Sequence, residues 1–230
     1  MSEDFDPRAL LIQGLRNFHN SRERTQQVEI GPSSIGDCRR KVYHQIKQTP
    51  ETNPETEILA SVLGIFIHKG IEAAILGDDD PFVKNFFTEL EVEYDGLKGH
   101  VDLYVKDKGL VCDFKTTSKK NLKGFPSQQN IYQIQVYAYL LKMSLGDDVK
   151  KVSLVVIPRD GRSDEIGLYL ADYDESIALK GIAWLEELED LAESGGKPPE
   201  PERSLAFCPR YCPYFDETAL VGCPSNGRKW

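Results

Sequence analysis

The sequence predicts a single α/β domain in which helices pack on a mixed β-sheet. Two observations support this prediction: apolar residues recur at helical spacing on both sides of the chain centre, and they alternate with polar residues at the centre itself. A chain of 230 residues is long enough to bury a full core in one domain. We therefore expect one domain over residues 1–230.

The central stretch reads as a β-hairpin. Residues 99–104 and 111–115 both alternate apolar with polar or charged side chains, and a short break containing Gly109 separates them. This pattern predicts two strands joined by a turn at residues 106–109.

Three charged residues of this hairpin are expected to converge. Positions two apart on a strand share a face, so Asp113 and Lys115 project together. Asp102 on the partner strand can face the same side. Two carboxylates suit a hard divalent cation, which polarises a phosphate oxygen, while a lysine steadies the nucleophile or the developing charge. For the D-x-K tripeptide alone, a solvated surface Asp-Lys pair is the better explanation because the tripeptide is common, so the surrounding residues must decide.

The remaining elements follow from the same patterns. We expect helices over residues 1–20, from Ser34 onward, and over 57–76, 129–145 and 173–193, with further strands at 87–94, 151–158 and 166–170. Two capping boxes are expected to open helices, one formed by Ser34 with Asp37 and one by Asp172 with Glu175.

Composition narrows the functional classes. Hydrophobic residues make up 40% and charged residues 28% of the chain, as in an ordinary soluble globular protein. No apolar run reaches membrane-spanning length, and the acidic N-terminus does not resemble a signal peptide, so we expect an intracellular protein with no membrane partner. The net charge of −9 argues against a general nucleic-acid coat but leaves a nuclease open.

Any contact with DNA would then depend on local basic patches. Two are present, one in the loop after the hairpin and one on the second expected helix. Their residues are Lys119, Lys120 and Lys123, and Arg39 and Arg40. Each patch could bind phosphate or could simply be solvated.

The five cysteines are an odd number, and three of them crowd the C-terminus. Cys208, Cys212 and Cys223 lie within sixteen positions, which suits zinc or an iron–sulfur cluster better than disulfides in a reducing compartment. Cys38 is the available fourth ligand, because Cys112 should be held in the core by its strand. Such a site would staple the N-terminal part of the chain to the tail.

The helix expected at 129–145 offers two polar pairs at a spacing of four. Gln133 shares a face with Tyr137, and Gln135 shares a face with Tyr139. Spacing alone does not choose between the two pairs.

Taken in order, these residues resemble the RecB-like branch of the PD-(D/E)XK nucleases. More narrowly, they resemble the iron–sulfur exonucleases associated with CRISPR adaptation and their phage-encoded relatives. The residues that carry the resemblance are Cys38, His68, Gly99-x-x-Asp102, Asp113-x-Lys115, Gln133-x-x-x-Tyr137, Cys208, Cys212 and Cys223. The resemblance spans about residues 33–224 and implies a restriction-endonuclease-like core.

The resemblance also implies roles for these residues. The ligands of a catalytic Mg²⁺ or Mn²⁺ would be His68, Asp102, Asp113 and the carbonyl of Phe114. Lys115 would orient or activate the attacking water, and Gln133 with Tyr137 would line the site. The expected catalytic residues are therefore Asp102, Asp113, Lys115, Gln133 and Tyr137.

For the cysteines, the resemblance implies a structural [4Fe-4S] cluster, with zinc as the less favoured occupant. Residues 33–47 and 205–224 would form an iron–sulfur subdomain, in which the cluster joins an N-terminal helix to the C-terminal tail. The ligands would be Cys38, Cys208, Cys212 and Cys223.

The implied function is a metal-dependent DNA exonuclease that degrades single-stranded DNA from 5′ to 3′. The resemblance further implies the cytoplasm of a prokaryotic or phage-infected cell, a recombinase or integrase partner, and a homo-oligomer. The alternative is a nuclease-inactive DNA-binding subunit of a recombination or CRISPR-adaptation complex.

Overall fold

The computed structural model describes residues 7–21, 30–76, 85–218 and 220–228. The acidic segment 1–6, on which the signal-peptide expectation rests, lies outside these residues. No helix in the described part of the chain is both long and apolar enough to cross a membrane.

The described residues form a five-stranded mixed sheet with the strand order β1-β2-β3-β4-β5. The strands are Phe86–Tyr94 (β1), Leu97–Val105 (β2), Leu110–Thr117 (β3), Lys151–Pro158 (β4) and Gly167–Asp172 (β5). Neighbours are antiparallel except β3 and β4, which run parallel and are joined by a helical crossover. The predicted α/β fold with a mixed sheet is confirmed.

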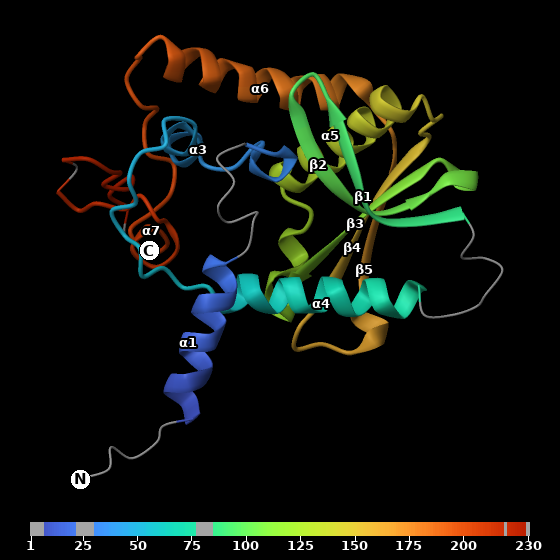
Figure 1. Ribbon diagram of the computed structural model, residues 1–230, viewed down its shortest axis with the longest axis horizontal. Helices are drawn as coiled ribbons and strands as arrows, with labels where there is room; N and C mark the ends of the chain where they lie inside the picture. The colour runs from blue at the N-terminus through green and yellow to red at the C-terminus, as the bar shows by residue number, and fades with distance from the viewer. Residues whose placement is uncertain (1–6, 22–29, 77–84, 219, 229–230) are drawn as a thin grey trace.

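Helices cover the sheet in layers. The helices are Pro7–Asn20 (α1), Arg39–Ile46 (α3), Leu59–Leu76 (α4), Gln128–Leu145 (α5), Glu175–Glu193 (α6) and Cys208–Tyr211 (α7). Short 3₁₀ turns are Pro32–Ser34 (η1), Lys106–Lys108 (η3), Lys119–Gly124 (η4) and Ser163–Glu165 (η5). Helix α5 packs on the sheet, α6 packs on α5, and α4 contacts β3 (Figure 1).

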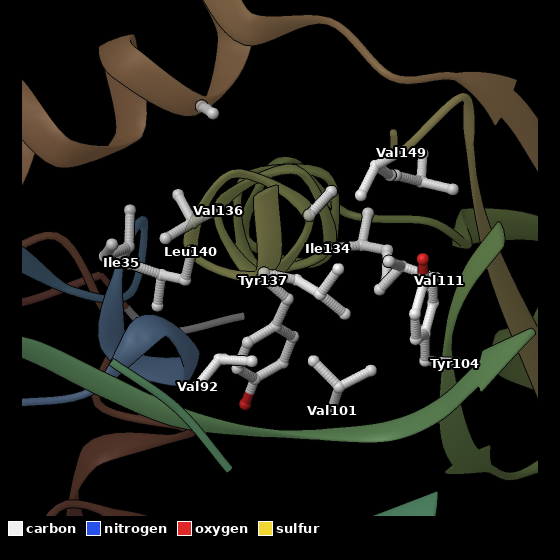
Figure 2. Packing of buried hydrophobic residues seen from close by; sticks show 14 of the residues in the cluster. Ile35, Val92, Val101, Tyr104, Val111, Ile134, Val136, Tyr137, Leu140 and Val149 are labelled. Atoms are coloured by element: carbon white, nitrogen blue, oxygen red, sulfur yellow. The ribbon is translucent and has the colours of Figure 1, made fainter. Parts of the chain in front are cut away.

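Helix α5 is the centre of the core. Ser127 caps its start by accepting a hydrogen bond from the backbone N–H of Asn130, and Gly146 ends it in the left-handed conformation. The helix is buried on several sides because it lies between the sheet and α6. Figure 2 shows Tyr137 reaching from α5 toward the strand that carries Val101. The middle of α5 therefore lies directly against β2.

The hairpin of β2 and β3 forms as expected, but the two strands stop pairing a short distance from the turn. Its turn is η3, closed by Gly109 with a φ of 57°. The ladder between β2 and β3 covers three pairs, the last of which joins Leu103 and Cys112. Beyond that pair, β2 continues only beside β1 and β3 only beside β4. The two strands thus diverge at the positions of Asp102 and Asp113.

The first expected capping box is wrong. Helix α3 begins directly after Cys38, which is its N-cap residue, and Ser34 belongs to η1. The carboxylate of Asp37 lies 2.8 Å from both Lys41 Nζ and Arg203 Nη2. Because two cations and the backbone N–H of Cys38 occupy this carboxylate, it cannot also cap a helix beginning at Ser34.

The second expected capping box is also wrong. Strand β5 continues through Asp172, whose carboxylate pairs with Lys151 at 2.7 Å. The N-cap residue of α6 is Asp174, which accepts a hydrogen bond from the backbone N–H of Ser176. Strand β5 ends two residues later than its alternation predicted, and α6 accordingly begins two residues later.

Helix α1 forms but packs less than its apolar residues suggested. None of its residues is buried, and Leu10 and Leu11 are each 62% exposed. Its main ring contact joins Phe18 to Phe66 of α4, with centroids 5.1 Å apart. Figure 1 shows α1 projecting from the N-terminal end of α4.

We predict that Gly99→Ala destabilises the domain through overpacking. A Cβ at this position would lie 2.6 Å from Cε1 of Tyr137 and 3.1 Å from Pro32. Overpacking of a core typically costs about 1–3 kcal/mol. Denaturant unfolding should show this loss, whereas Gly70→Ala, which meets no atom within 4 Å in α4, should be neutral or stabilising. Equal effects of the two substitutions would contradict this account of β2 packing.

Candidate active site

A cavity of about 810 Å³ lies where β2 and β3 diverge. Its walls come from α4, β1, β2, β3 and α5. The polar residues on these walls include His68, Lys69, Glu72, Glu89, His100, Asp102, Asp113, Lys115, Gln133 and Tyr137. The structure therefore brings together all five expected catalytic residues and the expected histidine.

Asp102 is fixed by the opening of the sheet. Its Oδ2 accepts a hydrogen bond of 2.7 Å from the backbone N–H of Phe114, which has no partner in β2 at this point of the ladder. The same oxygen lies 3.5 Å from Nδ1 of His68 on α4. This interaction with Asp102 raises the pKa of His68 despite its partial burial. The ring of His68 also meets the ring of Phe114 edge-on, with centroids 6.4 Å apart.

Asp113 is the most buried carboxylate of the cavity, with 2% of the residue exposed. Its Oδ1 accepts hydrogen bonds from Lys115 Nζ at 3.0 Å and Gln133 Nε2 at 3.3 Å. Burial raises the pKa of Asp113 to about 6, although the charge of Lys115 opposes the shift. Oδ2 lies 2.7 Å from Nζ but accepts no well-directed hydrogen bond from the described residues. Both oxygens of Asp113 therefore lie beside the ammonium group of Lys115.

Gln133 connects Asp113 to the wall of the cavity. Its Nε2 also donates to the hydroxyl of Tyr137 at 3.2 Å, so one amide group holds both side chains. Gln135 faces away, because its amide bonds to the backbone of Asp172 and Asp174 at the start of α6. Of the two pairs that the sequence offered, the structure places Gln133 and Tyr137 at the cavity.

Glu89 is a candidate ligand that the sequence analysis missed. It lies in β1 opposite Asp102, and its φ of 47° is left-handed, which costs a non-glycine residue about 1–3 kcal/mol. One ligand atom from each of His68, Glu89 and Asp102 lies within 4.8 Å of the other two. Glutamates recur at every second position of β1, so alternation could not single out Glu89.

The donor set fits a divalent metal ion. Carboxylate oxygens suit Mg²⁺ and Mn²⁺, and an imidazole adds a ligand that Mn²⁺ accepts well. Oδ2 of Asp113 is buried and lies 2.7 Å from Nζ of Lys115, so this carboxylate already faces a positive charge within the site. Phe114 lines the cavity, and the use of its carbonyl as a ligand stays a prediction.

The four cysteines that the sequence analysis grouped line one small cavity of about 50 Å³. All four are buried free thiols, and Cys112 lies apart, buried within β3. Burial, reinforced by the neighbouring sulfurs, raises the pKa of Cys208 to about 12. Since thiolates would repel one another there, a bound cation or cluster is what this donor set fits. The cysteines of the cavity are Cys38, Cys208, Cys212 and Cys223.

The cysteine-rich tail is bonded to the segment that leads into α4. Nδ2 of Asn53 donates to the carbonyls of Pro209 at 2.9 Å and Cys212 at 3.0 Å. The backbone N–H of Glu57 donates to the carbonyl of Arg210 at 2.8 Å. Since α4 carries the candidate histidine, these bonds connect the cysteine region with the wall of the active-site cavity.

The expected DNA-contacting residues do not line the cavity. Arg39 pairs with a glutamate of α6, Arg40 donates to a backbone carbonyl of the following linker, and Lys119 pairs with η5. Lys120 and Lys123 are exposed. A role of these five residues in binding DNA stays a prediction.

No protein-family model matches the chain, and no curated protein is significantly similar to it. Solved structures do match. The crystal structure of SSO0001 is 22% identical, with 98% of this chain and 100% of that chain covered, at a TM-score of 0.57. An alkaline exonuclease (LHK-Exo) from Laribacter hongkongensis is 14% identical, covering 74% and 93% of the two chains at a TM-score of 0.46.

A phage-related exonuclease from Haemophilus somnus 129PT is 10% identical, with 68% of this chain and 93% of that chain covered, at a TM-score of 0.39. The first comparison extends over nearly the whole length of both chains. This chain therefore shares its fold with SSO0001.

Proposed function

We propose that the chain is a divalent-metal-dependent deoxyribonuclease. One observation carries the proposal: His68, Asp102, Asp113 and Lys115 line a single cavity at the point where two strands diverge. Two acids and an imidazole can hold the cation, and an ammonium group lies beside them. That combination supports metal-assisted hydrolysis of a phosphodiester.

The chain's own residues would prepare the site for this reaction. The Phe114 N–H and the Gln133 amide hold Asp102 and Asp113 in fixed orientations. Lys115, paired with Asp113, can orient the attacking water and offset the negative charge that develops on the phosphate. The water oxygen bonds to phosphorus and releases a proton, the ester P–O bond breaks, and the leaving oxygen takes up a proton, so that one water is added across the bond.

The cation would be Mg²⁺ or Mn²⁺, held by His68, Asp102 and Asp113, with the Phe114 carbonyl as the further expected ligand. When bound, it supplies Lewis acidity to a phosphate oxygen. Without a cation, the protein favours the protonated forms of His68 and Asp113, because the pKa of each group is raised, so a bound cation would take the place of these protons.

We further propose exonuclease action on single-stranded DNA from 5′ to 3′, in a prokaryotic or phage-infected cell. These details, like a recombinase or integrase partner and a homo-oligomer, rest on the resemblance of the sequence motifs. The fold shared with SSO0001 supports the architecture on which the motifs sit.

For the cysteine cavity we propose a structural [4Fe-4S] cluster, with zinc as the alternative occupant. Four buried thiols from the start of α3 and from the tail supply the ligands of either. The hydrogen bonds from Asn53 and Glu57 to the tail would extend this restraint to α4.

The runner-up function is a nuclease-inactive DNA-binding subunit of a recombination or CRISPR-adaptation complex. The complete set of two acids, an imidazole and a lysine in one cavity favours the enzyme. Binding of labelled single strands without any cleavage in Mn²⁺ would favour the subunit instead.

We expect Asp113→Asn and Lys115→Ala each to slow Mn²⁺-dependent cleavage of end-labelled DNA by at least about 100- to 1,000-fold. Asp113→Asn removes a proposed metal ligand, and Lys115→Ala removes the ammonium group that lies beside Asp113. Lys108→Ala provides the matched control, because Lys108 is an exposed lysine of the hairpin turn, outside the cavity. Undiminished cleavage in both site variants would exclude this site.

Metal binding should depend on pH in a defined direction. Burial raises the pKa of Asp113 to about 6, and the interaction with Asp102 raises that of His68, so both groups hold protons near pH 6 when no cation is bound. A cation must displace these protons. The affinity for Mn²⁺, measured by calorimetry, should therefore rise as the pH increases from 5, by up to about tenfold per unit for each displaced proton, and should level off once the pH exceeds the pKa of both groups.

The pH dependence has its own control. Asp113→Asn should weaken binding at pH 7.5 and flatten the pH dependence, because one of the two protons is gone. A wild-type affinity that stays constant over this pH range would contradict the assignment of these ligands.

The occupant of the cysteine cavity has a spectroscopic signature. Protein purified without oxygen should absorb near 400 nm if it holds an iron–sulfur cluster, whereas zinc, with its filled d shell, gives no such band. Cys208→Ser should remove the band and lower the thermal midpoint, whereas Cys112→Ser should retain the band. A colourless protein that contains one bound zinc ion would mean that zinc, and not an iron–sulfur cluster, occupies the cysteine cavity.

A further inference from the structure

Arg159 lies one residue beyond β4, at the edge of the sheet where β3 also ends. The two strands run parallel, and Thr117 and Pro158 form their last pair. The backbone N–H of Arg159 extends this pairing by donating to the carbonyl of Thr117 at 2.8 Å. Its side chain turns back along β3, where Nη1 donates to Oγ1 of Thr116 at 3.1 Å. Thr116 lines the active-site cavity, so Arg159 lies at the rim of this cavity.

The guanidinium group of Arg159 keeps donors for a ligand. A guanidinium carries five N–H donors, and the bond to Thr116 uses one nitrogen. Arg159 is exposed, and no carboxylate among the described residues pairs with it. Its neighbours differ, because Arg162 forms two hydrogen bonds to Asp164 and Lys119 pairs with η5. Arg159 therefore presents an uncompensated positive charge beside the cavity.

Helix α4 leaves space next to the threonine that Arg159 contacts. Gly64 of α4 lines the same cavity, and a Cβ at this position would lie 3.5 Å from Oγ1 of Thr116. A glycine inside a helix is unfavourable relative to alanine. Any larger side chain at position 64 would cover the threonine hydroxyl. The glycine thus keeps this hydroxyl, and the arginine bonded to it, open to the cavity.

The charges of the cavity favour this side for a phosphate group. The rest of the wall carries four carboxylates, which attract cations and repel phosphates: Glu72, Glu89, Asp102 and Asp113. Along β3 toward its carboxyl end, Asp113 is followed by Lys115 and then by Thr116 with its bonded arginine. The donors to an anion therefore gather at the β3 and β4 end of the cavity.

We propose that Arg159, together with the hydroxyl of Thr116, binds a phosphate of the DNA strand next to the phosphate that is cleaved. The proposal rests on the nuclease function proposed above and names a residue that positions its substrate. An arginine fork bonds two phosphate oxygens at once. Arg159 touches no reacting atom in this arrangement and is a positioning residue. Its ligand is an internal phosphodiester, and a terminal 5′-phosphate, which has the same chemistry, is a separate arm of the test.

The first test measures binding of a short labelled thymidine strand to the full chain by fluorescence anisotropy. The solution contains Ca²⁺, and the strand is checked to be intact afterwards. Arg159→Ala should weaken binding by about tenfold or more, because hydrogen bonds to a charged group are lost. The slope of log Kd against log salt should fall by about 0.7, the value for one phosphate contact on a single strand.

Two further variants separate a phosphate contact from a structural role. Arg159→Lys keeps the charge but not the fork, so it should retain the salt slope and recover part of the affinity. Arg162→Ala is the matched control, because its exposed arginine is already bonded to Asp164, and it should leave both quantities unchanged. If Arg162→Ala weakens binding as much as Arg159→Ala does, general loss of positive charge explains the effect and the proposal is overturned.

Strands that carry one neutral methylphosphonate linkage locate the phosphate. In the wild-type protein, this replacement should weaken binding at the linkage next to the cleaved one, whereas Arg159→Ala should be insensitive to it. The same losses in both proteins at every linkage would overturn the proposal. A defect of Arg159→Ala that appears only with 5′-phosphorylated strands would place Arg159 at the strand terminus and overturn the assignment to an internal phosphate.

Cleavage in Mn²⁺ separates this proposal from the nuclease function. Arg159→Ala should raise KM and leave kcat nearly unchanged, because the contact is made equally in the ground state and the transition state. Binding that depends on Arg159 without any cleavage by the wild-type protein overturns the nuclease and leaves the phosphate site standing. Cleavage by the wild-type protein with normal strand binding by Arg159→Ala, or no strand binding by the wild-type protein in Ca²⁺, overturns the phosphate site.

Discussion

The hydrogen bond from the Phe114 backbone to Asp102 is the interaction on which the site depends. It forms because β2 and β3 stop pairing after Leu103 and Cys112, which leaves a backbone donor of β3 facing the gap. The carboxylate of Asp102 accepts the hydrogen bond from this donor and lies at the point where β2 and β3 separate. If β2 and β3 stayed paired along their whole length, their backbones would occupy the space that the cavity now occupies.

The opening also explains how residues from both faces of the sheet meet. Asp113 points toward α5, where Gln133 holds it, whereas the adjacent Phe114 lies against His68 of α4. Consecutive strand residues face opposite sides, so a closed sheet would keep these groups apart. Helix α5 is fixed by the core on several sides, and the segment before α4 is bonded to the cysteine-rich tail at Asn53. The two walls of the site are thus held by different parts of the chain.

Much of this arrangement could be predicted from the sequence, because alternation and helical spacing report directly on which face a residue occupies. The hairpin, the mixed sheet and the juxtaposition of Asp102 with Asp113 and Lys115 follow from these periodicities. The capping boxes were wrong because capping competes with ion pairs and strand extension, which depend on distant partners such as Arg203. Glu89 was missed because its left-handed backbone leaves no trace in a strand of alternating glutamates.

The most direct test of the account asks whether the helix imidazole touches the cation. Electron spin echo envelope modulation of the Mn²⁺-loaded protein detects nitrogen bonded to manganese. We predict a ¹⁴N coupling typical of imidazole in the wild-type protein and its loss in His68→Gln, with Mn²⁺ still bound. A Mn²⁺ spectrum without nitrogen coupling in the wild-type protein, or the same coupling in both proteins, would contradict the central claim that the divergent strands and α4 build one metal centre.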